Sequence, residues 1–260
     1  MSRAASPGLR ALVWDVDGTL AETERDGHRV AFNLAFKEFG LPWRWDSVTY
    51  GRLLQVTGGR ERLLHDFASR PGLPADAGER ERLAAELHRR KNAIYATLLE
   101  SRGIALRPGV RELIEAGCAE GVAQAIATTT SRANVEALLR HGLGADWRQR
   151  FAAVVCAEDA PAKKPHPQAY LLALQQLGCA AHEAIAIEDS PNGLAAARGA
   201  GIATVVTRSA YFARQPFDGA LAVCEDLCTP QPVSLDRLRG WLQRGPAITG
   251  GAAQAPARRC

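Results

Sequence analysis

The pattern of hydrophobic and polar positions changes near the start of the chain. Residues 10–16 (RALVWDV) form a short apolar run that ends near a carboxylate and is followed by Gly18, which predicts a buried strand running into a sharp turn. From about residue 24 to residue 101, apolar positions recur with helical spacing, over 30–40, 46–56, 59–70 and 76–101. No convincing strand pattern interrupts these segments. The first strand is therefore expected to lead into an all-helical region.

After Pro108 the chain alternates between helical and strand-like patterns. We expect helices over 109–120, 132–142, 167–178, 191–200 and 234–242, and strands over 122–129, 152–158, 184–189, 203–208 and 221–225. Such alternation indicates a parallel sheet. The predicted fold class is α/β, a Rossmann-like doubly wound parallel sheet formed by residues 1–20 and 102–242, with an inserted all-helical cap domain over 21–101. In such sheets ligands bind beyond the carboxyl ends of the strands.

The composition, 47% hydrophobic and 23% charged, is typical of a soluble globular protein. No apolar run approaches the ~20 residues of a membrane helix, and the N-terminal segment lacks the apolar stretch of a secretory signal. We therefore expect a cytoplasmic protein, most simply a monomer, without a membrane partner. A net charge of +4 is too small and dispersed to predict nucleic-acid binding, and favours small anions as partners.

Two further features follow from composition. The segment 243–260, rich in Gly, Ala and Pro, is expected to be disordered and to carry no site. The cysteines are scattered, and only Cys224 and Cys228 are close together in sequence. Without histidines or a second cysteine pair at metal spacing, a zinc site is not expected, and all six cysteines are predicted to be reduced thiols.

Polar groups follow four of the predicted strands. They are Asp15-Val16-Asp17-Gly18-Thr19, Thr128-Thr129-Thr130, Lys163-Lys164-Pro165 and Glu188-Asp189-Ser190. Since the carboxyl ends of parallel strands meet at one edge of a sheet, these groups can converge on one crevice. Four carboxylates there would repel one another unless a lysine and a divalent cation compensate them, and oxygen ligands favour Mg²⁺.

Each group taken alone has an ordinary structural explanation. The DVDGT segment could be a turn with a capping aspartate, Thr128 a buried strand residue, and Lys164 a solvated loop charge. Glu188 and Asp189 could cap the helix that begins at Pro191. The ordered set at four strand ends is more specific than any one of its members.

In their order, DVDGT (15–19), Thr128, Lys164-Pro165 and EDS (188–190) resemble the four motifs of the haloacid dehalogenase superfamily. The resemblance implies a Mg²⁺-dependent phosphohydrolase in which Asp15 is a transiently phosphorylated nucleophile and Asp17 is the general acid and base. It implies that Thr128 binds the transferring phosphoryl group and that Lys164 offsets its charge. The implied metal ligands are Asp15, the backbone carbonyl of Asp17, Asp189 and, directly or through water, Glu188.

The helical segment carries a second, more specific resemblance. Residues 20–33, 43–50, 56–63 and 87–95 are similar to the CbbY-like branch of the superfamily, although residues 25–27 depart from the acidic and apolar pair of other members. The known activity of that branch is dephosphorylation of xylulose 1,5-bisphosphate, an inhibitor of Rubisco. The resemblance therefore implies a phosphorylated sugar as the small-molecule substrate and a role in carbohydrate metabolism connected with the Calvin cycle.

A bisphosphate needs a second phosphate cradle. Thr57, Gly58, Gly59 and Arg60 offer backbone N–H groups at a helix start together with a guanidinium. On the longest helix, His88 and Lys91 lie on one face and either point to the crevice or border the apolar face. The remaining predicted substrate-binding residues are Glu22, His28, Tyr50, Thr129, Thr130, Ser131, Arg132 and Asn134. For three of these the alternatives are a buried core position (Tyr50), a solvated helix face (His28) and a first helical turn (Arg132).

Other functions stay open at this stage. A phosphomutase resembling β-phosphoglucomutase would share the core, the cap and the acid–base carboxylate. Dehalogenation fits less well, because it needs neither Mg²⁺ nor Asp17. A catalytically inactive sugar-phosphate-binding regulator is disfavoured by the intact Asp15, Asp17, Lys164 and Asp189.

Overall fold

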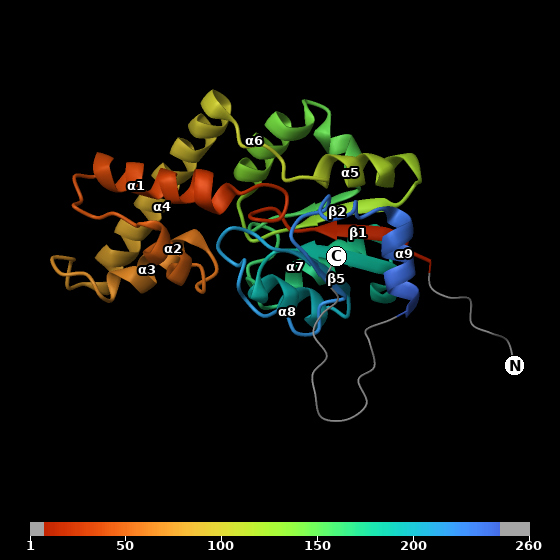
Figure 1. Cartoon of the computed structure of the whole chain (residues 1–260). Helices are drawn as coiled ribbons and strands as arrows, with labels where there is room; N and C mark the ends of the chain where they lie inside the picture. Colours follow the sequence, from red (N-terminus) through yellow and green to blue (C-terminus); the bar gives the residue numbers. More distant parts are fainter. Residues whose placement is uncertain (1–7, 245–260) are drawn as a thin grey trace, which may run out of the picture.

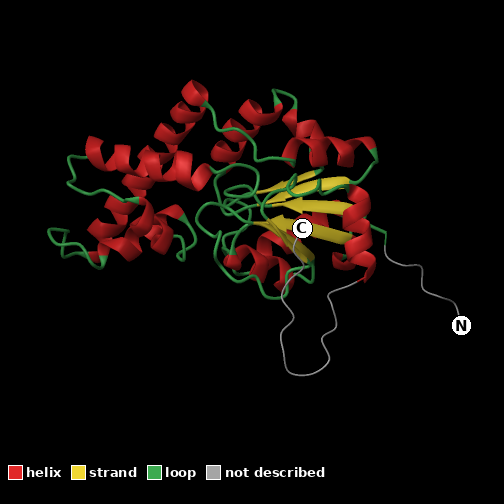
Figure 2. Ribbon diagram, in the orientation of Figure 1, coloured by secondary structure: helices red, strands yellow, loops and turns green. Residues whose placement is uncertain are grey.

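The computed structural model describes residues 8–244, and a parallel sheet lies at its centre (Figure 2). Its strand order is β3-β2-β1-β4-β5-β6, and every neighbouring pair is parallel. The strands are β1 Ala11–Trp14, β2 Ala123–Ala127, β3 Ala153–Val155, β4 Ala184–Glu188, β5 Ala203–Thr207 and β6 Ala222–Cys224. This is the doubly wound order, so the predicted α/β fold class is confirmed.

Helices cover both faces of the sheet, because its strands are apolar on both sides. Along β1, Ala11 and Val13 belong to one hydrophobic cluster, while Leu12 and Trp14 belong to the other. The flanking helices are α5 Val110–Ala119, α6 Arg132–Leu143, α7 Gln168–Leu177, α8 Pro191–Gly199 and α9 Leu235–Arg244, with short 3₁₀ turns at Trp147–Arg150 and Ala181–Glu183. Burial on both faces is what fixes a parallel sheet between two helical layers.

The segment between β1 and α5 is helical and lies to one side of the sheet (Figure 1). It contains a π-helical turn at Glu24–His28, followed by α1 Arg29–Glu38, α2 Ser47–Leu53, α3 Gly59–Phe67 and α4 Ala77–Arg102. Asp46 and Asp76 cap α2 and α4 by accepting hydrogen bonds from backbone N–H groups. The expected helices are present, whereas the π-helical turn has no counterpart in the predicted pattern. The assignment of 21–101 as a separate cap domain stays a proposal.

Two further expectations concern membrane-spanning helices and the C-terminal segment. Within the described residues, no helix is both long and apolar enough to cross a membrane. Helix α9 includes residues 243 and 244, so the expectation of a disordered 243–260 segment is wrong there, and the rest lies outside the described residues.

The cysteine prediction holds only in part. Cys118, Cys156, Cys179 and Cys228 are free thiols, but Cys224 is disulfide-bonded, so its predicted reduced state is wrong. Spacing along the chain did not reveal this pairing, because it does not show which cysteines meet in space. Cys260 lies outside the described residues.

Candidate active site

The site forms where the strand order reverses, between β1 and β4. The register pairs Trp14 with Ile187, so Asp15 follows β1 beside Glu188, and the Asp15 N–H donates to the Ile187 carbonyl at 3.0 Å. On the other side of β1, strand β2 delivers Thr128, whose N–H donates to the Val155 carbonyl. Parallel strands on both sides of β1 thus bring these groups to one edge of the sheet.

A buried lysine joins two of the carboxylates. Lys164 Nζ donates to Asp15 Oδ1 and to Glu188 Oε1, each at 2.6 Å, and the Tyr170 hydroxyl donates to the same Glu188 oxygen at 2.6 Å. Burial lowers the pKa of Lys164, but the charges of the two carboxylates raise it more, so the ammonium is retained. Burial and the charge of Glu188 raise the pKa of Asp15 to about 7, against the opposing effect of Lys164.

Three carboxylates form a buried cluster suited to a cation. One oxygen each from Asp15, Glu188 and Asp189 lie within 4.8 Å of one another. The pKa of Asp189 lies well above its usual range, because burial and the charges of Asp15 and Glu188 raise it. One lysine therefore does not compensate the cluster, and these oxygen ligands fit a hard divalent cation.

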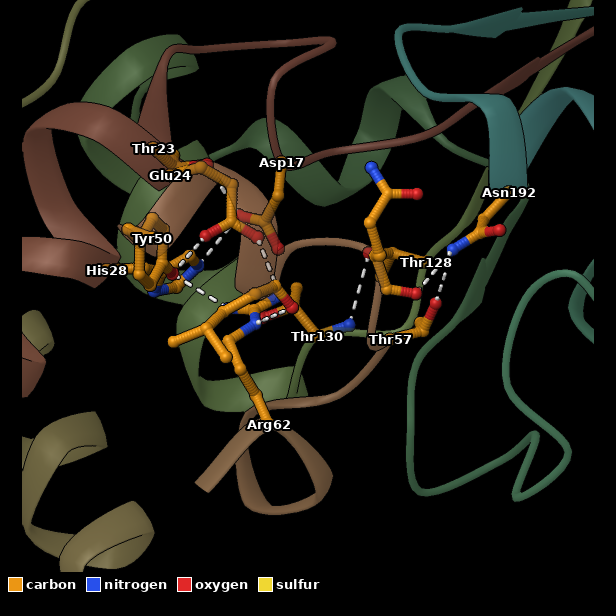
Figure 3. A network of polar contacts seen from close by, with 12 residues as sticks. Asp17, Thr23, Glu24, His28, Tyr50, Thr57, Arg62, Thr128, Thr130 and Asn192 are labelled. Atoms are coloured by element: carbon orange, nitrogen blue, oxygen red, sulfur yellow. Dashed lines mark hydrogen bonds and ion pairs between the residues drawn. The ribbon is translucent and has the colours of Figure 1, made fainter. Parts of the chain in front are cut away.

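The Asp17 side chain points towards Thr23 and His28 of the helical segment (Figure 3). Its Oδ1 accepts a hydrogen bond from the Thr23 hydroxyl at 2.6 Å and lies 2.9 Å from His28 Nε2. Lys91 Nζ lies 2.8 Å from the other ring nitrogen of His28. Burial raises the pKa of Asp17, but His28, Thr23 and Lys91 lower it more, so it lies well below its usual range. Asp17 is therefore ionised in this structure.

A cavity of about 590 Å³ unites most of the predicted residues. Its lining combines the strand-end groups with side chains of α3, α4 and α6, so both halves of the chain contribute. The predicted residues that line it are Asp15, Asp17, His28, Thr57, Gly58, Gly59, Arg60, His88, Lys91, Thr128, Thr129, Thr130, Ser131, Asn134, Lys164 and Asp189.

Three predicted substrate-binding residues do not line this cavity. The predicted metal ligand Glu188 does not line it either and is fully buried. Glu22 instead accepts a hydrogen bond from the Ala210 N–H, and Tyr50 is fully buried and donates to Glu24. Arg132 pairs with Asp159 at 2.5 Å.

Sequence reasoning missed several residues that complete the site. Glu24 and Arg62 line the cavity and form an ion pair at 3.6 Å, bridged by the Tyr50 hydroxyl, which donates to Glu24 at 2.5 Å and accepts from Arg62 at 2.8 Å (Figure 3). Lys163 forms an ion pair with Glu61 of α3 at 2.6 Å. The alternating charges that follow the Gly58-Gly59 turn were the only feature of the sequence that indicated these residues. They do not show which face of the helix packs against the core.

The raised pKa of Asp15 makes a prediction for the metal-free protein. A folded-state pKa of about 7 against an ordinary value of 3.8 means that the stability contribution is fully present below pH 3.8 and is lost as the pH rises through 7. Wild type should therefore lose at least about 1.4 kcal/mol in free energy of unfolding relative to Asp15→Asn between pH 4 and pH 7. Urea unfolding in EDTA at both pH values measures it. Parallel pH profiles of the two proteins would contradict it.

A family comparison defines the class of the protein. The family model of haloacid dehalogenase-like hydrolases matches residues 9–201. The chain therefore belongs to the haloacid dehalogenase-like hydrolase family. It is 47% identical over 222 residues to the plasmid CbbY protein of Cupriavidus necator, covering 85% of this chain and 87% of that protein. It is 42% identical to CbbY of Cereibacter sphaeroides, covering 82% and 90%.

A solved structure extends the comparison to a ligand complex. A mutant of CbbY from Rhodobacter sphaeroides, crystallised with xylulose 1,5-bisphosphate, matches this structure with a TM-score of 0.79 at 39% identity. The match covers 85% of this chain and 96% of that one. Together with the family, these relatives place the chain in the CbbY-like branch and identify it as a phosphatase.

Proposed function

We propose that this chain is a Mg²⁺-dependent phosphatase that hydrolyses xylulose 1,5-bisphosphate through a phosphorylated Asp15. The observation that carries the proposal is one cavity whose lining combines two parts: the buried Asp15–Lys164 pair, here called the core end, and the Thr57–Arg60 turn where α3 begins. The CbbY structure crystallised with this sugar bisphosphate supports the choice of substrate. A cytoplasmic location and a monomeric state stay predictions.

The core end fits phosphoryl transfer through a covalent intermediate. Asp15 attacks phosphorus in line while Lys164 holds its carboxylate, so the P–O bond to the sugar breaks as the bond to Asp15 forms. The Thr128 hydroxyl and neighbouring N–H groups bind the phosphoryl oxygens. Asp15, Glu188, Asp189 and the Asp17 carbonyl would hold Mg²⁺, which supplies positive charge to the phosphoryl oxygens when bound.

Asp17 would serve both halves of the reaction. As an acid it protonates the departing sugar oxygen, and as a base it takes a proton from the water that hydrolyses the phosphorylated Asp15. The positive groups around it keep it ionised in the structure, which suits the second half. A bound phosphate dianion raises the pKa of a neighbouring carboxyl group, which favours the protonated form needed in the first half.

The second phosphate would bind at the turn that begins α3. Gly58 has a φ of +98°, and a Cβ atom on Gly59 would lie 2.7 Å from His88, so both positions need glycine for the turn to lie against α4. Burial and the charges of Lys91 and Lys163 lower the pKa of His88 to about 4, which keeps it neutral at pH 7. The turn also contacts the core, because the Asn192 amide donates to Thr57 Oγ1 at 3.1 Å (Figure 3).

A substrate comparison with an Arg60 variant tests the proposal. Wild type should release phosphate from xylulose 1,5-bisphosphate with a higher kcat/KM than from xylulose monophosphates, and EDTA should stop the reaction. A charge-assisted guanidinium–phosphate contact contributes about 1.5–3 kcal/mol, so Arg60→Ala should lower kcat/KM for the bisphosphate about 10- to 150-fold. For monophosphates the change should be under about threefold. Binding energy from this remote group can also appear in kcat.

The matched control is Arg44→Ala, which removes an exposed arginine outside the cavity and should leave both substrates unaffected. Equal losses on bisphosphate and monophosphate would contradict a distal phosphate site at Arg60. Formation of an isomeric sugar phosphate in place of free phosphate would favour the phosphomutase.

A further inference from the structure

Arg107 lies at the junction of two chain segments, both of which join the helical region to the sheet. These segments follow β1 and α4, and they pair through a backbone bridge between Ala21 and Leu106. The Arg107 N–H also donates to the Leu20 carbonyl at 2.8 Å. The arginine side chain is only 7% exposed, although it does not line the cavity.

The guanidinium is held by carbonyl oxygens from three separate segments. Nη1 donates to the Gly18 carbonyl at 2.5 Å and to Thr207 Oγ1 at 2.9 Å. Nη2 donates to the carbonyls of Arg208 at 2.6 Å and Glu225 at 2.9 Å. A buried guanidinium is costly unless its donors are satisfied, and only the planar fork of arginine reaches several acceptors at once. The nearest carboxylate, on Glu22, lies 3.6 Å away.

Gly18 links this arrangement to the cation cluster. Its backbone lies directly against the Asp189 carboxylate, since a Cβ atom on Gly18 would lie 2.1 Å from Asp189 Oδ2. Gly18 is also fixed on its other side, because its N–H donates to the Ala21 carbonyl at 2.9 Å. Arg107 therefore fixes the peptide that forms one wall of the Asp189 site, and it ties that wall to the end of β5.

We propose that Arg107 is a positioning residue that orients Asp189 for metal binding by holding the Gly18 carbonyl against the end of β5. This inference rests on the proposed metal dependence. It also predicts in which direction the affinity for Mg²⁺ changes when the arginine is removed. A nearby positive charge alone would oppose a divalent cation, so its removal would tighten metal binding. A positioning residue has the opposite effect, because its loss lets Asp189 leave the binding geometry.

The test is the dissociation constant for Mg²⁺, measured by calorimetry on the full chain without substrate. Arg107→Met should weaken binding about 10- to 100-fold, the range found when groups that orient metal ligands are removed. Arg107→Lys keeps the charge but cannot reach all the carbonyls, and should weaken binding about 3- to 10-fold. The control is Arg111→Met, since exposed Arg111 donates to the Gly142 carbonyl, neither residue lines the cavity, and the change should alter binding less than twofold.

Unchanged binding in Arg107→Lys, or tighter binding in Arg107→Met, would overturn the positioning role. If Arg107→Met does not fold, which circular dichroism shows, Arg107→Lys decides alone. The substrate proposal is checked separately, because phosphate release by wild type does not depend on these variants. Absence of Mg²⁺ binding to wild type would overturn the metal dependence of the proposed function and this inference with it.

Discussion

Asp15→Asn is expected to abolish phosphate release while leaving the protein at least as stable as wild type. The amide has the shape of the carboxylate but cannot attack phosphorus, so kcat should fall at least ~10³-fold. Stability should not fall, because the change removes one of three buried carboxyl groups whose charges repel one another, and it leaves Lys164 paired with Glu188 at 2.6 Å. Phosphate release at saturating substrate and thermal unfolding at pH 7 measure the two effects.

The control for this substitution is Asp218→Asn, which changes an exposed aspartate that does not line the cavity and should leave kcat unchanged. Mass spectrometry of acid-quenched wild type should find phosphate on the peptide that contains Asp15. Activity above a few per cent of wild type in Asp15→Asn, in a preparation free of contaminating phosphatase, would remove Asp15 from the nucleophile role.

The core half of the site follows closely from the sequence. Asp15 and Glu188 come directly after apolar strand patterns, and a parallel sheet places such positions at one edge whatever the details of packing. Lys164 could be predicted for the same reason, since it follows the third strand of the chain. Contacts between residues far apart in the chain could not be predicted from the sequence. The Tyr170 hydroxyl reaches Glu188 from α7, and Arg107 reaches Gly18 across 89 positions of the chain.

The cavity residues in the helical region were predicted less well. Which side chains of a helix face the cavity depends on how the helix is rotated about its axis, and the sequence does not fix that rotation. Residues 24–28 form a π-helical turn, which is wider than an α-helical turn and shifts which residues face the cavity. Glu24 and His28 of this turn line the cavity, whereas Glu22, which was predicted to bind substrate, precedes the turn and accepts a hydrogen bond from the Ala210 N–H outside the cavity. Tyr50 illustrates a different limit, since its sequence position fitted both a substrate ligand and a buried cap residue, and the structure shows the latter.

The two roles proposed for Asp17 give the second large effect, and they can be separated with two substrates. Asp17→Asn keeps the backbone carbonyl and the approximate shape of the side chain next to Thr23 and His28, but it can neither donate nor accept the catalytic proton. For a sugar phosphate, whose leaving oxygen needs a proton, kcat/KM should fall at least ~10²-fold. Nitrophenolate leaves without protonation, so kcat/KM for p-nitrophenyl phosphate, which reports the steps up to phosphorylation of Asp15, should change far less.

Hydrolysis of the phosphorylated Asp15 is the same step for both substrates and needs Asp17 as the base. Asp17→Asn should therefore release about one nitrophenolate per active site in a rapid burst and then turn over slowly, while the phosphorylated protein accumulates. Stopped-flow absorbance measures the burst, and mass spectrometry detects the added phosphate on Asp15. Asp15→Asn, which lacks the nucleophile, is the control and should give no burst. Equal losses in kcat/KM on both substrates without a burst would contradict proton transfer by Asp17, and would assign the loss to a disturbed loop between β1 and the π-helical turn.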